Sequence, residues 1–140
     1  MRPRLGRLRV IYAVCMLAGA STHAAMLWQH GLFWDYGGVP RVTQVYWTSL
    51  TFLDPLAAIL LFVFPRVGLL AILAIISSDV THNLWFFERY HVPFNWMLAA
   101  QGVFLVFVGT TFPIVWRSLK FDTPDTIAKA PVKRSEPSSQ

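Results

Sequence analysis

The stretch Val67–Phe87, VGLLAILAIISSDVTHNLWFF, decides the fold. An α-helix needs about 20 predominantly apolar residues to cross the roughly 30 Å hydrocarbon core of a bilayer. This stretch is long enough, yet its second half carries Asp79, His82 and Asn83. An ionisable side chain at such a depth costs about 2.5–3.5 kcal/mol on insertion scales, so it marks a functional site by default. The stretch therefore predicts both a transmembrane helix and a candidate site within it.

The composition extends the membrane assignment to most of the chain. Hydrophobic residues make up 55% of the 140 residues and charged residues only 14%, whereas soluble domains have about 25% charged residues. Only seven of the charged residues lie between positions 10 and 116. We expect an all-α membrane protein, a bundle of four transmembrane helices. Its predicted segments are a basic N-terminus (1–9), four spans (about 10–29, 43–64, 67–87 and 94–116) and a disordered tail (117–140).

The distribution of basic residues predicts the orientation of the bundle. With four spans and the N-terminus inside, ten Lys and Arg residues fall on the inner side, and Arg41 and Arg89 fall in the outer loops. Basic residues near span ends favour the cytoplasmic side. We expect both termini in the cytoplasm and a multi-pass protein of the cell (inner) membrane. The net charge of +5 follows from this pattern and does not indicate nucleic-acid binding.

The first span has a competing interpretation. A basic start, an apolar run from Val10 to Leu17 and the small residues 18–20 also fit a signal peptide cleaved near residue 20. We favour an uncleaved anchor, because the low-charge sequence continues far enough to complete a span.

The spans place their polar residues at a common depth. At 1.5 Å per residue, Asp54 lies roughly 15 Å from the inner end of its span, Asp79 about 18 Å, and His23, His82 and Gln101 about 20–23 Å. All four helices thus carry a polar side chain within a slab less than ~10 Å thick. This shared level predicts a ligand-binding or proton-relay site formed by residues from every span: Asp79, His82, Asp54, His23, Asn83 and Gln101.

The helical faces add detail to this site. Asp79, His82 and Asn83 share one face of their helix, at spacings i, i+3 and i+4. A carboxylate beside His82 or His23 would favour the charged imidazole, whereas desolvation would favour the neutral one, so the site suits proton exchange. Trp47 and Trp85 are candidate pocket aromatics for an apolar or cationic ligand.

Two other interpretations stay open. The polar residues can be structural contacts between helices, in a structural or accessory subunit that docks a membrane-protein partner. Alternatively, His23 and His82 can ligate haem or a transition metal. Our preferred interpretation needs no cofactor.

The sequence offers little support for an enzyme. It contains no glycine-rich phosphate loop, no CxxC and no HExxH motif. Ser77, Ser78 and Thr81 lie near Asp79, but such hydroxyls commonly bond to carbonyls of the preceding turn. The partners that we expect are the lipid bilayer and a small ligand, not nucleic acid.

Overall fold

The computed structural model describes the backbone of residues 2–119 and the side chains of residues 6–119. It contains four helices, α1 (Arg2–His30), α2 (Arg41–Val63), α3 (Pro65–Tyr90) and α4 (Trp96–Ser118). All four are long and apolar enough to cross a membrane. The predicted all-helical fold, with four helices long and apolar enough to span a membrane, is therefore confirmed. The predicted tail lies outside the described residues, apart from residues 117–119.

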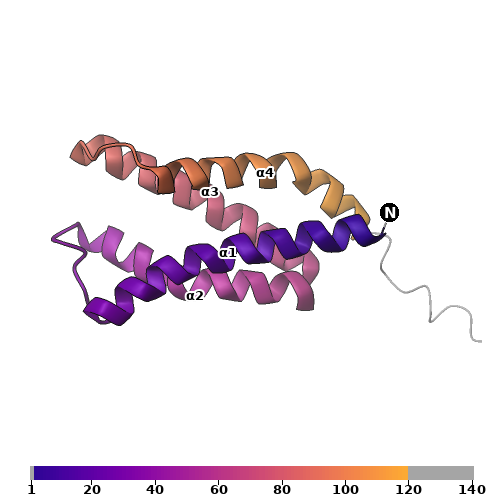
Figure 1. The fold of residues 1–140 in the computed structure, drawn as a ribbon, viewed down its shortest axis with the longest axis horizontal. Coiled ribbons are helices and arrows are strands. Elements are labelled where there is room, and N and C mark those ends of the chain that lie inside the picture. Colours follow the sequence, from indigo (N-terminus) through magenta and orange to yellow (C-terminus); the bar gives the residue numbers. More distant parts are fainter. Residues whose placement is uncertain (1, 120–140) are drawn as a thin grey trace, which may run out of the picture.

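Consecutive helices pack side by side and run back and forth (Figure 1). The N-terminus, the α2–α3 turn and the end of α4 lie at one end of the bundle, which we call the terminal end. The α1–α2 and α3–α4 loops lie at the other, the loop end. The first and last helices close the bundle through Tyr12, whose hydroxyl lies 2.5 Å from that of Thr111 and whose ring packs on Phe107.

The helix boundaries follow local chemistry. The first helix begins at Arg2 rather than after the basic segment, since arginine has a high helix propensity. It ends before Gly31, whose positive φ of 85° accompanies a bond from its N–H to the Leu27 carbonyl. The fourth helix begins after Asn95, whose side chain accepts a hydrogen bond from the Leu98 N–H at 3.1 Å. Both spans with an internal proline, at Pro55 and Pro113, remain single helices.

The turn between α2 and α3 is very tight. Phe64 alone separates the two helices, and Pro65 is the first residue of α3, a position where its missing N–H costs nothing. A Cβ atom on Gly68 would overlap the backbone of Leu60 and Leu61. Glycine at this position therefore allows α3 to fold directly back onto α2.

The largest apolar core and the buried polar side chains are separate groups in the bundle. The buried apolar core lies toward the terminal end and joins all four helices; it comprises Tyr12, Ala13, Met16, Ala57, Ala58, Leu61, Leu69, Ile72, Val108, Val115 and Leu119. The buried polar side chains Thr43, Asp54, Asp79 and Asn83 lie outside this core. Thr43, Asp79 and Asn83 lie in the loop-end halves of their helices, whereas Asp54 lies near the middle of α2.

Candidate functional site

Asp54 is a buried carboxyl group between α1 and α2. Its side chain is only 6% exposed, and its Oδ1 atom is enclosed without a hydrogen-bond partner. Gly19 of α1 faces it: a Cβ atom built there would lie 3.3 Å from Oδ2 of Asp54. The small residue thus leaves α1 close to the carboxyl group without supplying a donor to it.

The turn that precedes Asp54 adds further unpartnered oxygen atoms. The hydroxyl oxygen of Thr51 is buried and makes no hydrogen bond. Pro55 has no N–H to donate to the carbonyl of Thr51, four residues earlier. Thr51 and Asp54 stand at i and i+3, on one face of α2. This face therefore presents a carboxyl oxygen and a hydroxyl group that have no hydrogen-bond partner, beside a carbonyl to which Pro55 cannot donate.

Asp79 is the second buried carboxyl group, and it belongs to a bonded network. It is 7% exposed, and its Oδ1 accepts a hydrogen bond from Nδ2 of Asn83 at 3.0 Å. The same amide donates to Oε1 of Gln101 on α4 at 2.9 Å and accepts from Nε1 of Trp47 on α2 at 3.0 Å. Asn83 thus joins α2, α3 and α4, and both of its amide N–H groups and its oxygen have partners. We call this the Asn83 network.

The two carboxyl groups interact electrostatically with each other and with the phenol of Tyr46. The Tyr46 hydroxyl lies 2.9 Å from Oγ of Ser78, across the α2–α3 interface. No lysine or arginine occurs in the segments 10–29, 42–63, 67–87 or 96–116, so the membrane level provides no basic side chain other than histidine. Two acidic groups therefore share a low-dielectric region without an arginine or lysine counterion.

His82 packs among aromatic rings instead of bonding to a carboxyl group. Its ring centroid is 4.4 Å from that of Tyr46 and 5.6 Å from that of Trp85, and Trp47 lies edge-on at 6.3 Å. Its Nε2 atom is buried and has no hydrogen-bond partner. The structure thus places His82 beside Tyr46, whereas Asp79 bonds to Asn83.

His23 is half-buried on α1, one turn beyond Gly19. No ring contact or hydrogen bond joins it to another side chain among residues 6–119, so the structure does not bring it together with His82. Within the described residues, no group of three or more His, Cys, Asp or Glu side chains is placed to hold a metal ion.

Aromatic rings form a continuous cluster above the polar level, toward the loop end. Stacked and edge-on contacts run from His30 through Trp34 and Tyr36 to Trp47, and from Trp47 through Phe86 to Tyr90. The two predicted pocket aromatics, Trp47 and Trp85, both contact His82. The rings pack against one another, and Trp47 connects them to the Asn83 network.

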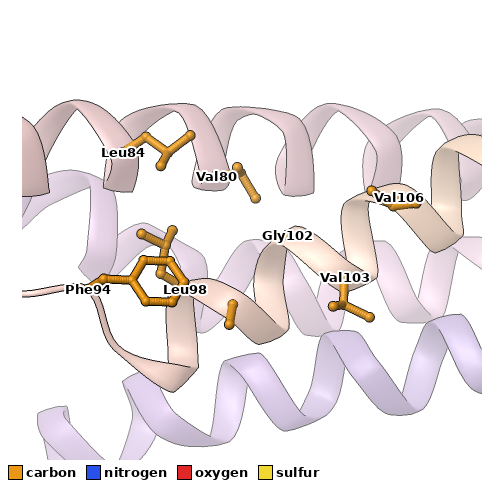
Figure 2. A pocket seen from close by; sticks show the side chains of 8 residues that line it. Val80, Leu84, Phe94, Leu98, Gly102, Val103 and Val106 are labelled. Atoms are coloured by element: carbon orange, nitrogen blue, oxygen red, sulfur yellow. The ribbon is translucent and has the colours of Figure 1, made fainter.

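A separate apolar groove runs along the outside of α3 and α4 (Figure 2). It has a volume of about 470 Å³ and is lined by Val80, Leu84, Phe94, Leu98, Ala99, Gly102, Val103 and Val106. Val103 is 71% exposed on the surface of α4. No charged or hydrogen-bonding side chain of residues 6–119 lines this groove, so it differs in chemistry from the acidic site.

Comparisons with family models, with curated proteins and with solved structures found no match to this chain.

The structure groups the predicted site residues in two ways. It joins Asp79, Asn83, Gln101 and Trp47 in one network and places Asp54 near Asp79, but it leaves His23 apart. The spacing of the polar residues places Thr51 on the same face of α2 as Asp54, but we did not predict Tyr46 as a site residue. Tyr46 stands eight residues before Asp54, a spacing that recurs on one helix face, and this pattern was the available signal.

Proposed function

We propose that this protein binds a small cationic ligand at the membrane-buried acidic pair Asp54 and Asp79, and that protons exchange with the ligand at this site. The proposal depends on one observation: the Oδ1 atom of Asp54 is buried and has no hydrogen-bond partner. A buried carboxylate without a partner is strongly unfavourable, because the interior does not replace its hydration. A bound cation or a proton would remove that cost.

The surroundings of Asp54 support a cation rather than a neutral ligand. Asp79 adds a second acidic group at the same level, and Thr51 adds an unpartnered hydroxyl oxygen. Oxygen atoms of this kind coordinate small cations in membrane proteins, often at interrupted helices. The rings of Tyr46 and Trp47 would also attract an organic cation through their faces.

The histidine supports the proton-exchange part of the proposal. Nε2 of His82 is buried and unpartnered next to Tyr46, which interacts electrostatically with both carboxyl groups. Imidazole exchanges protons in the neutral pH range more readily than any other unperturbed side chain. His82 is therefore our candidate for passing protons between the carboxyl groups and the loop end.

The accessory-subunit interpretation accounts for only part of the site. It explains the Asn83 network, whose hydrogen bonds hold three helices together. It does not explain a buried carboxyl oxygen that bonds to nothing, because a residue kept for helix packing is expected to make hydrogen bonds.

We also propose that both termini are cytoplasmic and that the bundle lies in the cell (inner) membrane. The support is the excess of arginine at the terminal end, as the positive-inside tendency requires. Reporter proteins fused to the C-terminus test the orientation: a fluorescent protein should be active and a periplasmic phosphatase inactive. The reverse result would overturn it.

The binding proposal is tested by thermal unfolding of the purified full chain with monovalent cations at constant ionic strength. The probes are Na⁺, K⁺, tetramethylammonium and benzylammonium, with benzyl alcohol as the neutral control. A ligand that binds only the folded state at 100 times its Kd stabilises it by about 2.7 kcal/mol. We expect at least one cation to raise the melting temperature by several degrees, and benzyl alcohol to have no such effect.

Two variants make this result specific. Asp54→Asn should abolish the cation effect, whereas Glu88→Gln, which alters an exposed acid at the end of α3, should preserve it. If no cation stabilises the wild-type protein, or if Asp54→Asn responds as the wild type does, the proposed function is wrong.

A further inference from the structure

The two ends of the bundle differ in charge. At the terminal end lie the arginines at positions 7, 9, 66 and 117, and no aspartate or glutamate of residues 2–119 lies there. At the loop end, Arg41 and Arg89 are matched in number by Asp35 and Glu88. One end is therefore strongly basic, whereas the other is balanced.

Arg9 is partly committed to the fold. Its guanidinium donates to the carbonyl of Leu61 at 2.6 Å and lies 5.2 Å from the ring centre of Phe62. The bond satisfies a carbonyl in the last turn of α2, where a cation is favourable. Arg9 thus adds positive charge to this end while part of its donor set is already used.

Arg66 and Arg117 keep donors for an external partner. Arg66 is exposed and donates to the carbonyl of Leu119 at 3.3 Å, which joins the start of α3 to the end of α4. A guanidinium has five N–H donors, so this bond leaves most of them available. Arg117 is also exposed and follows Trp116, a residue type that favours the headgroup region.

The height of these two arginines identifies the partner. Arg66 is the second residue of α3 and Arg117 the next to last of α4, so both lie at ends of candidate spans, where we expect the helices to leave the hydrocarbon. At that height the negative groups of a bilayer are the phosphates of its lipids. Guanidinium binds phosphate through paired hydrogen bonds as well as charge.

We propose that Arg66 and Arg117 form a binding site for the headgroup of an anionic phospholipid at the terminal end of the bundle. Arg9 strengthens the attraction by its charge. This site is independent of the acidic pair in the membrane, and it requires no particular orientation of the protein.

The test measures which lipids stay bound to the full chain. The protein is reconstituted into bilayers of equal parts phosphatidylglycerol and phosphatidylcholine with identical acyl chains, and native mass spectrometry then counts the retained lipids. We expect phosphatidylglycerol to be enriched over phosphatidylcholine, and the enrichment to fall as NaCl is raised. One basic residue near an anionic surface raises the affinity for that surface roughly fivefold. The double variant R66Q/R117Q should therefore reduce the enrichment by more than about fivefold.

The loop end provides a matched control. The double variant R41Q/R89Q removes the same charge from the opposite end and should keep the enrichment within about twofold, because Asp35 and Glu88 already balance the charge of Arg41 and Arg89 there. Equal losses in the two double variants would show a general attraction to the charged chain and overturn the site. Absence of enrichment in the wild type would do the same.

A second variant protects the test against misfolding. Arg66 bridges two helices, so R66Q/R117Q could fail to fold, whereas Arg117→Gln alters an exposed side chain only. Alone, Arg117→Gln should lower the enrichment roughly fivefold. An unchanged enrichment in folded Arg117→Gln would contradict the proposal.

Discussion

Asp54 and Asn83 are both buried polar residues of the membrane level, but they differ in how their polar atoms are satisfied. The amide of Asn83 bonds to Trp47, Asp79 and Gln101, and it joins three helices. The carboxyl group of Asp54, similarly buried, has an enclosed oxygen with no partner. The two side chains are therefore equally buried but differ in whether their polar atoms have hydrogen-bond partners.

Because their hydrogen bonding differs, we infer different roles for Asp54 and Asn83, although the sequence analysis grouped both in one polar level of the membrane. A bonded polar group in a membrane contributes to helix association, with measured couplings that average about 0.6 kcal/mol. An unbonded one contributes no such coupling, so its retention requires another reason. Substitution of Asn83 should therefore lower the free energy of unfolding more than substitution of Asp54 does.

The largest effect is expected for Asn83→Leu. The substitution removes three hydrogen bonds, which at about 0.6 kcal/mol each amounts to roughly 2 kcal/mol of stability. Unfolding in a titration with sodium dodecyl sulfate, followed by tryptophan fluorescence, measures it. Thr110→Leu is the control, because the Thr110 hydroxyl is exposed and bonds to carbonyls of its own helix. Equal stabilities of Asn83→Leu and the control would show that the network does not hold the helices together.

A smaller effect is expected for Gln101→Leu. This substitution removes a single bond of the network, the one from Asn83 to α4, and should cost about 0.6 kcal/mol. In a double-mutant cycle with Asn83→Leu, the two costs should not add, since both variants remove the same bond. Additive costs would mean that Gln101 and Asn83 stabilise the bundle separately.

The smallest effect on stability is expected for Asp54→Asn. The carboxyl group makes no hydrogen bond with the described side chains, so its replacement leaves no former partner unsatisfied. Stability should stay within about 0.5 kcal/mol of the wild type or increase, because the carboxyl group has no hydrogen bond to lose. The same denaturant titration measures the change. A loss as large as that of Asn83→Leu would place Asp54 among the packing residues.

The sequence was sufficient to predict the four spanning helices because long apolar runs and turn residues act locally. It was less informative at the helix ends. The helical start at Arg2 has no apolar pattern, and the cap at Asn95 could have been recognised from an asparagine just before an apolar run.

The candidate site could be predicted only in part. Spacing along α3 grouped Asp79 with His82, but the rotation of neighbouring helices decides which side chains meet. The bond between Asn83 and Gln101 joins residues 18 positions apart, and that between Trp47 and Asn83 joins residues 36 apart. Helical periodicity cannot specify such pairs, because it says nothing about how two helices face each other.

The most direct test of the account is the reaction of the full chain with dicyclohexylcarbodiimide, an apolar reagent that adds to protonated carboxyl groups. Peptide mapping by mass spectrometry locates the product. We expect modification at Asp54, its loss in Asp54→Asn, and at least tenfold slower reaction in the presence of the cation that stabilises the protein. Modification confined to exposed acids such as Glu88, or a rate at Asp54 that no cation changes, would contradict the claim that Asp54 is a cation-binding group.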